Sequence, residues 1–203
     1  MQTPACASRR RTLQRGAVGA LVALAGLATV GPGGAWAAAE TAEPPALPTE
    51  LRTELPGASP QGTATLRFLG VAIYQARLWA GNRVLAGSYA QSPFALELTY
   101  FRALSGKRIA ERSLQEMQRQ ASLSAAQERS WLDAMLQAFP DVAAGDRITG
   151  LHTPGVGARF WHNGQSRPGV ADAAFSRLFF GIWLSEASSE PTMRAQLLGQ
   201  SAP

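Results

Sequence analysis

Cysteine and histidine, which supply many metal ligands and catalytic groups, are scarce in this sequence. Cys6 is the only cysteine, and His152 and His162 are the only histidines. Cys6 lies in a segment that we interpret as a removable leader, so the rest of the chain has no thiol for a disulfide, a zinc site or a nucleophile. Neither histidine stands near a cysteine or a group of carboxylates. We therefore expect no metal site and no cofactor.

The usual catalytic motifs are absent as well. The sequence has no Gly-x-Ser-x-Gly nucleophile motif, no phosphate-binding loop and no His-Glu-x-x-His zinc motif. Gly155-Val156-Gly157 lacks the third glycine of a dinucleotide-binding motif and stands between two predicted strands, so we interpret it as a loop. Either histidine could act as a base or proton donor, but a sheet histidine with a satisfied hydrogen bond is the favoured interpretation. These patterns assign no catalytic residue.

The first 39 residues have the organisation of an export signal. Four arginines between residues 9 and 15 precede an apolar run from Ala17 to Val30, and small residues follow at Ala35 and Ala37. The run is too short and too rich in glycine for a typical membrane span. Its Arg-Arg pair also resembles a twin-arginine signal. We expect residues 1–39 to be a signal peptide, removed on export to the periplasm by the secretion or twin-arginine route, with no membrane span left in the mature chain.

The charge excess of the chain belongs to this leader. Four of the 19 basic residues lie in residues 1–39, which contain no acidic residue, so the remainder has 15 basic and 14 acidic residues. A nearly neutral chain lacks the charge that phosphate binding requires, and we expect no nucleic-acid partner. Residues 40–61 are rich in proline and predict an extended tether or an extended edge of the domain. Residues 62–203 are long enough for one domain with its own core.

Periodicity predicts a domain of strands and helices in two layers. Residues 64–80 alternate with period two and predict one long strand, with a bend or bulge at Gly70. A second strand is predicted at residues 94–102, and Asn163-Gly164 predicts a tight hairpin within residues 158–169. We expect helices at residues 106–121, 124–139 and 172–184, and a last one from Pro191. This pattern is typical of an α+β fold.

One predicted strand face suggests a ligand pocket. Tyr100 and Arg102 follow three apolar residues on the same face of the strand at 94–102, which places a phenol and a guanidinium at the end of an apolar surface. Such a surface could bind an amphipathic acid. Arg108 and Arg112 in the next helix could add charge, and Tyr74 needs a partner or ligand if its hydroxyl is buried. Alternatively, Arg102 pairs with Glu97, Glu111 or solvent, and Tyr100 is a core residue.

Several segments together resemble the chalcone isomerase-like family, and more closely its exported bacterial branch than the plant enzymes. The resemblance covers residues 62–199 and depends on the order and spacing of its segments. These segments are Leu66 to Tyr74, Arg102 to Gly106, Phe139-Pro140, Gly145-Asp146, Asn163-Gly164, Gly181 to Leu184 and Leu197 to Gly199. It implies an open-faced β-sandwich, in which a large antiparallel sheet has helices packed on one face and a ligand cleft lies between sheet and helices.

The sequence departs from the plant isomerases at the positions that carry their chemistry. In an ungapped alignment, Leu69 replaces a threonine, Ile109 a tyrosine and Glu116 an asparagine. Leucine and isoleucine cannot order a water molecule, so we expect the ring-closing reaction to be absent. The resemblance also includes fatty-acid-binding members, in which an arginine and a tyrosine hold the carboxylate.

Our leading expectation is therefore an exported, non-catalytic binder of an apolar or amphipathic small molecule, such as a fatty acid. The candidate ligand-binding residues are Tyr74, Tyr100, Arg102 and Arg112. Two alternatives remain open. One is an isomerase or intramolecular lyase that acts on a chalcone-like substrate through other residues, such as His162 or Glu116. The other is a structural partner in an envelope complex. The sequence leaves the oligomeric state open.

Overall fold

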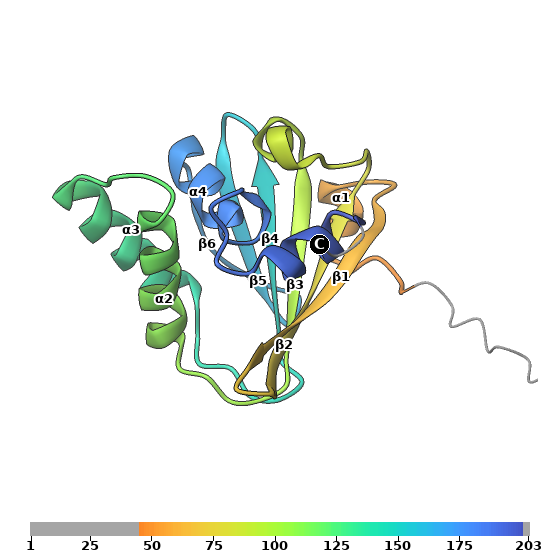
Figure 1. Ribbon diagram of the computed structural model, residues 1–203, viewed down its shortest axis with the longest axis horizontal. Coiled ribbons are helices and arrows are strands. Elements are labelled where there is room, and N and C mark those ends of the chain that lie inside the picture. The colour runs from red at the N-terminus through yellow and green to blue at the C-terminus, as the bar shows by residue number, and fades with distance from the viewer. Residues whose placement is uncertain (1–44, 201–203) are drawn as a thin grey trace, which may run out of the picture. The chain divides into compact units, whose positions relative to one another are not determined.

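The computed structural model describes residues 45–200, so the predicted signal peptide lies outside the described residues. The domain is built on one antiparallel sheet of six strands, in which each strand pairs with the next one along the chain (Figure 1). The strands are β1 (Ser59–Phe68), β2 (Val71–Ala80), β3 (Phe94–Tyr100), β4 (Arg147–Thr153), β5 (Gly157–His162) and β6 (Gln165–Val170).

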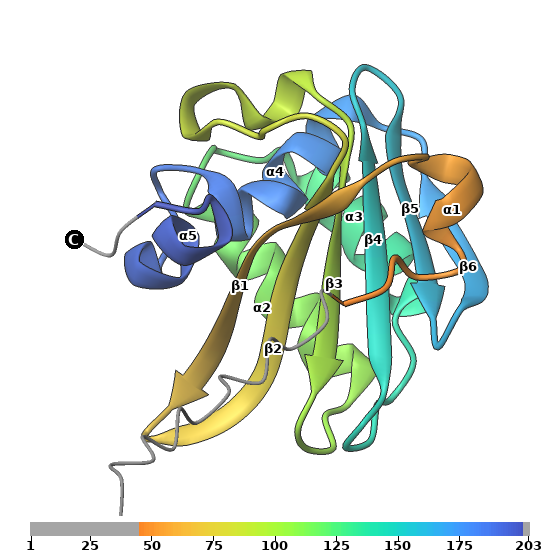
Figure 2. The same ribbon diagram turned by 90° about the vertical axis from the view of Figure 1, so that its right-hand side faces the viewer.

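Four helices of seven residues or more pack against one face of this sheet, which we call the inner face (Figure 2). They are α2 (Gly106–Gln118), α3 (Ala125–Ala138), α4 (Ala173–Leu184) and α5 (Pro191–Leu197), and a short 3₁₀ helix, η1, spans Ala86–Gln91. The predicted α+β fold, with a large antiparallel sheet and helices on one side, is confirmed. No helix within residues 45–200 has both the length and the apolar character needed to cross a membrane.

Local signals in the sequence account for the ends of several elements. Asn163 and Gly164 both have positive φ, at 50° and 81°, and form the tight turn between β5 and β6. Asp172 caps α4 by accepting hydrogen bonds from the backbone N–H groups of Ala174 and Phe175. The hairpin and the helix after it therefore form where the sequence predicts them.

The predicted long strand at residues 64–80 is wrong. It is two strands, β1 and β2, joined by a turn at Leu69 and Gly70, whose φ angles are 48° and 80°. Phe68 pairs with Val71 across this turn. The apolar centre of the segment is the exposed tip of a hairpin.

The main core lies between the inner face and the helices. Aromatic side chains of α4 dominate it: the rings of Phe175 and Phe179 stack with centroids 5.6 Å apart, and both meet Phe160 of β5 edge to face. Buried side chains of β2 and β3 continue the same cluster toward α2 and α5. Burial of this apolar surface is the main force that holds the helices on the sheet.

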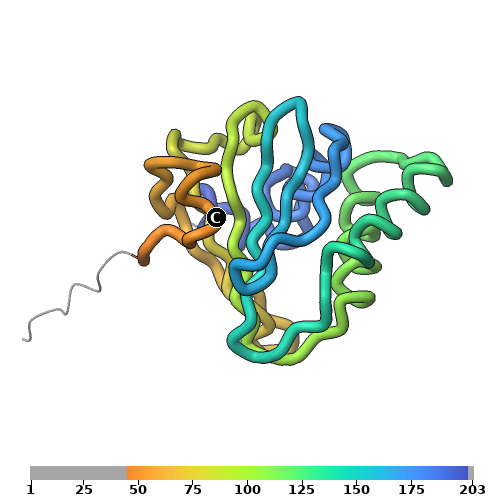
Figure 3. Tube along the Cα trace, turned by 180° about the vertical axis from the view of Figure 1, so that it is seen from behind, coloured from red at the N-terminus to blue at the C-terminus, as the bar shows by residue number. Residues whose placement is uncertain are grey.

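The proline-rich stretch is packed rather than a free tether in its described part, residues 45–61. It contains a one-turn helix, α1 (Leu51–Glu54), and the start of β1. Leu51 and Leu55 are buried on the outer face of the sheet, opposite the larger helices, against Trp79 and Trp161. Figure 3 follows this segment in orange, on the far side from α2 and α3. Residues 45–61 therefore belong to the folded domain.

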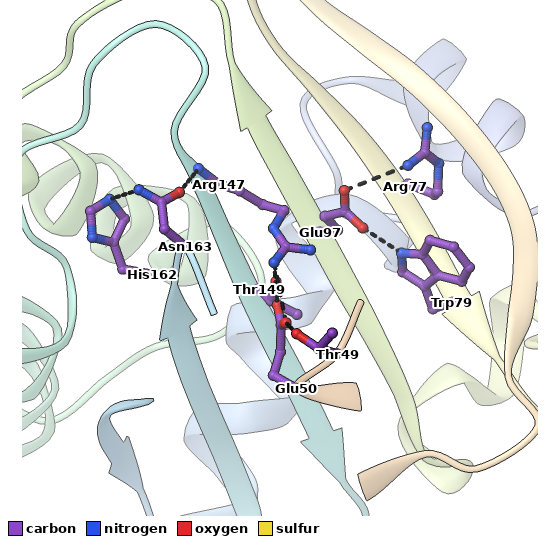
Figure 4. A network of polar contacts seen from close by, with 9 residues as sticks. All are labelled: Thr49, Glu50, Arg77, Trp79, Glu97, Arg147, Thr149, His162 and Asn163. Carbon is purple, nitrogen blue, oxygen red and sulfur yellow. Dashed lines mark hydrogen bonds and ion pairs between the residues drawn. The ribbon is translucent and has the colours of Figure 1, made fainter. Parts of the chain in front are cut away.

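Polar contacts also fix this segment to the outer face (Figure 4). Glu50 pairs with Arg147 at 2.9 Å and accepts a hydrogen bond of 2.8 Å from the Thr149 hydroxyl. On the same face, Glu97 accepts a hydrogen bond of 2.8 Å from the Trp79 indole and lies 3.5 Å from Arg77. Glu97 is thus engaged by residues other than Arg102.

Candidate functional site

A cavity of about 310 Å³ lies between the inner face of the sheet and the helices. Its sheet wall is formed by Leu66, Ile73, Tyr74, Leu98, Tyr100 and Ile148. Its helical wall comes from α2, α4 and residues 188–193, together with Leu104 and Phe139. The lining is mostly aliphatic and aromatic, and the volume is at the lower end of the range of about 300–1,000 Å³ that is usual for small-molecule sites.

Two tyrosines from neighbouring strands face each other in this cavity. Tyr74 of β2 and Tyr100 of β3 are paired residues in the sheet, and their rings meet edge to face with centroids 5.8 Å apart. The Trp183 indole N–H donates a hydrogen bond of 3.0 Å to the Tyr74 oxygen. The Tyr100 hydroxyl makes no hydrogen bond within residues 45–200, although the residue is only 2% exposed. Its oxygen is not fully buried, because the fully buried side-chain atoms without a partner in residues 45–200 are Arg77 Nε and Ser185 Oγ. A hydroxyl that lines a cavity without a protein partner is a candidate contact for a ligand.

Both phenols are hydrogen-bond donors at neutral pH. Burial raises the pKa of Tyr100 and of Tyr74 well above the ordinary tyrosine value, because the charged phenolate would lose its hydration. At Tyr74 the hydrogen bond from Trp183 opposes this rise in pKa but is the smaller effect. The hydroxyl proton of Tyr74, like that of Tyr100, has no acceptor in the described domain. The cavity thus offers two neutral O–H donors on an apolar wall.

Charged residues of α2 lie at the opening of the cavity. Arg112 is exposed and contacts Glu116, one turn away, at 2.6 Å. Glu116 is buried and also lies 3.5 Å from Arg119. Arg108 is exposed, lines the same opening and forms no ion pair with any residue between 45 and 200. One guanidinium at the opening is therefore available to an anionic group of a ligand.

The structure brings together three of the four predicted site residues. Tyr74, Tyr100 and Arg112 line the cavity, whereas Arg102 does not. The prediction that Arg102 continues the strand face is wrong, because β3 ends at Tyr100 and the chain bends there. Arg102 is exposed in that bend and pairs with neither Glu97 nor Glu111. The guanidinium expected from Arg102 is supplied at the cavity by Arg108.

Sequence reasoning missed the C-terminal part of the lining. Trp183, Ser188, Ser189, Glu190 and Met193 reach the cavity from the end of α4 and the start of α5. Only the indole of Trp183 gave a usable signal, since a buried indole N–H needs an acceptor. The partner it finds, Tyr74, is 109 residues away in the sequence.

Other singled-out residues fall partly outside the cavity. Ile109 and Glu116 line it, but Leu69 lies at the β1–β2 turn and does not.

His152 is buried in β4, where its ring nitrogens contact the Ser176 hydroxyl and the Ala90 carbonyl, as the favoured interpretation predicts. His162 ends β5 and lies 3.5 Å from Asp146, away from the cavity lining. Residues 45–200 contain no group of three potential metal ligands.

Comparison with known proteins identifies the family to which this chain belongs. A family model described as chalcone isomerase-like matches residues 61–199. The chain is also similar to a solved structure, a fatty-acid binding protein of Arabidopsis thaliana, with a TM-score of 0.57 and 11% sequence identity over 71% of this chain and 88% of that one. At that identity the likeness shows the fold alone. A search of curated proteins finds no match. Since the family model spans more than half of the sequence, the chain belongs to the chalcone isomerase-like family.

Proposed function

We propose that this protein is an exported, non-catalytic binder of a small amphipathic molecule, a carboxylate with an apolar body such as a fatty acid. The observation that carries the proposal is the cavity itself, in which the Tyr100 hydroxyl lines the wall and has no protein partner. The apolar lining accommodates the body of the ligand, and Tyr100 and Tyr74 donate hydrogen bonds to its oxygen atoms. Periplasmic localisation, through the leader at residues 1–39, is part of the same proposal.

An unpaired guanidinium at the opening of the cavity offers a contact for an anionic group of the ligand. Arg108 has no carboxylate partner in the described chain, and Arg112 lies one turn further along α2. A guanidinium binds a carboxylate with two parallel hydrogen bonds, which a hydroxyl or carbonyl group cannot reproduce. Glu116, the buried carboxylate beside them, is already engaged by Arg112 and Arg119. The four charged lining residues, which also include Glu190, carry no net charge, so the attraction for an acidic ligand comes from the unpaired guanidinium of Arg108.

The cavity also favours a binder over a purely structural partner. A structural protein has no need of a hollow core, and an empty apolar cavity lowers stability in proportion to its volume. The fold is similar to that of a protein titled a fatty-acid binding protein, which agrees with a ligand of this class. We therefore propose that the cavity is retained for a ligand.

Titration calorimetry with saturated fatty acids of increasing chain length tests this function. We expect saturable binding of one acid per chain, with the best affinity for medium chains, because the cavity is small. Arg108→Gln should weaken binding about tenfold, as expected for loss of a hydrogen-bonded charge pair. Arg129→Gln, on the exposed side of α3, is the matched control. Native mass spectrometry of the purified protein would reveal a co-purified ligand.

Two results would contradict the proposal. One is protein that carries no ligand and also ignores fatty acids of every length tested. The other is binding that survives Arg108→Gln and Tyr100→Phe unchanged, which would place the ligand elsewhere.

A further inference from the structure

The turn between β1 and β2 has a sequence that its conformation does not favour. Leu69 adopts a positive φ of 48°, which costs a branched, non-glycine residue steric strain. The same chain provides the comparison, because the turn between β5 and β6 has nearly identical φ angles and carries Asn163, the usual residue for this position. Leu69 is also 88% exposed. Neither local conformation nor packing therefore explains this leucine.

Leu69 belongs to an exposed apolar patch, which we call the hairpin tip. Phe68 is 67% exposed and Val71 48%, on either side of the turn. Phe101, 47% exposed, lies beside them, since its backbone N–H donates to the carbonyl of Ile73 in β2. Figure 2 shows this hairpin projecting at the lower end of the sheet, away from α3 and α4. Contiguous exposed apolar side chains of this kind mark contact sites.

Basic side chains border the hairpin tip. Arg67 is exposed and donates only to the Gly70 carbonyl, at 3.3 Å, and Arg102 is exposed without an ion pair in the described domain. No acidic residue occurs between Glu54 and Glu97. At the same end of the sheet, Asp141 accepts from the Gly106 N–H, and Asp146 accepts from Ala143 and Asn163. The tip therefore combines apolar side chains with unpaired positive charge.

We propose that the hairpin tip binds the surface of an anionic phospholipid bilayer. Phe68, Leu69 and Val71 enter the interfacial region between head groups and acyl chains, and Arg67 and Arg102 contact the lipid phosphates. A protein partner would need an apolar pocket with carboxylates placed to match both arginines, whereas an anionic lipid surface offers both features without a matching shape. Leu66 and Ile73, each two residues from the tip on β1 and β2, line the cavity. Binding at the tip thus brings the cavity wall to the membrane.

Sedimentation with lipid vesicles tests this surface. The protein is a chain that begins at Glu40, because an apolar leader would itself bind lipid and residues 47–198 contain both hydrophobic clusters. Vesicles of phosphatidylcholine alone are compared with vesicles of equal parts phosphatidylcholine and phosphatidylglycerol. We expect binding to the anionic vesicles, weakened by added salt, and much less binding to the neutral ones.

Leu69→Asn is the decisive variant, because it installs the residue found at the matching turn. It should keep or raise the thermal midpoint while it lowers vesicle binding about tenfold. Arg102→Gln should lower binding about fivefold. Val156→Asn changes another exposed apolar turn residue, at the opposite end of the sheet, and should leave binding unchanged. Leu69→Asn should bind fatty acids with the same affinity as the wild type. A failure of the membrane-binding proposal can therefore be told apart from a failure of the ligand-binding proposal.

Three outcomes would overturn the proposal. Wild-type protein that does not sediment with anionic vesicles is one. Leu69→Asn that binds vesicles as well as the wild type is another. The third is a concentration-dependent dimer that Leu69→Asn disrupts, without lipid binding by either form, because the tip would then bind a second copy of the chain.

Discussion

Tyr74 and Tyr100 are paired across β2 and β3 and meet edge to face, yet their hydroxyls have different surroundings. The Tyr74 oxygen accepts a hydrogen bond from Trp183 of α4, which links the sheet to the helical layer. The Tyr100 oxygen has no such link within residues 45–200. Removal of the Tyr74 hydroxyl should therefore affect both stability and ligand binding, and removal of the Tyr100 hydroxyl should affect ligand binding alone.

Tyr100→Phe should weaken ligand binding without loss of stability. The substitution removes only the hydroxyl, which has no protein partner, so we expect the free energy of unfolding to change by less than about 0.5 kcal/mol. The affinity for a fatty acid should fall about tenfold, because a hydrogen bond to a charged oxygen is lost. Urea unfolding measures the free energy of unfolding, and calorimetric titration of the same preparation measures the affinity. A large loss of stability with unchanged affinity would show a structural role instead.

Tyr74→Phe should lower stability in the ligand-free protein. It leaves the Trp183 N–H without its acceptor, at a cost of about 1–2 kcal/mol in the free energy of unfolding. Urea unfolding of the two phenylalanine variants side by side is the measurement. Equal stability of Tyr74→Phe and wild type would contradict the linking role of this hydrogen bond.

Glu116→Gln should raise the affinity for anionic ligands. The buried carboxylate holds Arg112 at 2.6 Å, and its neutralisation releases that guanidinium toward the opening of the cavity. We expect about a two- to fivefold gain in fatty-acid affinity, with a loss of about 0.5 kcal/mol in stability from the broken helix pair. Glu111→Gln, which removes the exposed pair with Lys107, is the matched control. Weaker binding by Glu116→Gln would mean that Glu116 itself contacts the ligand.

His152 should make the protein less stable as the pH falls. Burial lowers its pKa below the ordinary value of 6.5, because the charged ring would lose its hydration. Below pH 6.5 the imidazole of the unfolded chain binds a proton more readily than that of the folded chain. The contribution of the neutral, buried His152 to the free energy of unfolding is therefore complete above pH 6.5 and is lost as the pH falls toward the folded-state pKa. We expect a flatter pH dependence of the thermal midpoint in His152→Asn. A folded-state pKa of His152 at or above 6.5, measured by NMR, would contradict this account.

Gly106→Ala should destabilise the start of α2, the helix that carries Arg108 and Arg112. A Cβ atom at residue 106 would lie 2.2 Å from the backbone oxygen of Phe139, and neither backbone can yield easily. We expect a loss of about 1–3 kcal/mol in unfolding free energy, measured with urea. Gly81→Ala, where a Cβ atom meets open space, is the control and should change stability by less than about 0.5 kcal/mol.

Elements with strong local signals could be predicted from the sequence. Asn163-Gly164 specifies its turn through backbone conformation, and Asp172 begins α4 with a side chain that caps the helix. The turn between β1 and β2 has no comparable signal in the sequence. Its first residue, Leu69, is typical of a strand and adopts a positive φ that leucine disfavours. The alternation of apolar residues therefore continued through the turn and predicted one strand.

The remaining errors arise from contacts between residues far apart in the sequence. Leu51 is buried in one cluster with Trp79 and Trp161, which a proline-rich segment does not reveal. Tyr74 and Tyr100 could be predicted to line the cavity because strand alternation places them on the inner face. Arg102 was placed there by the same alternation, extended two residues beyond the true end of β3. Trp183 reaches the site only through the packing of α4.

A crystal structure of the chain with decanoic acid would test the ligand-binding account most directly. The account predicts electron density for the acid in the cavity of about 310 Å³, with a ligand oxygen within hydrogen-bond distance of the Tyr100 hydroxyl. Density for the acid at another place on the molecule, with the cavity unchanged, would contradict it.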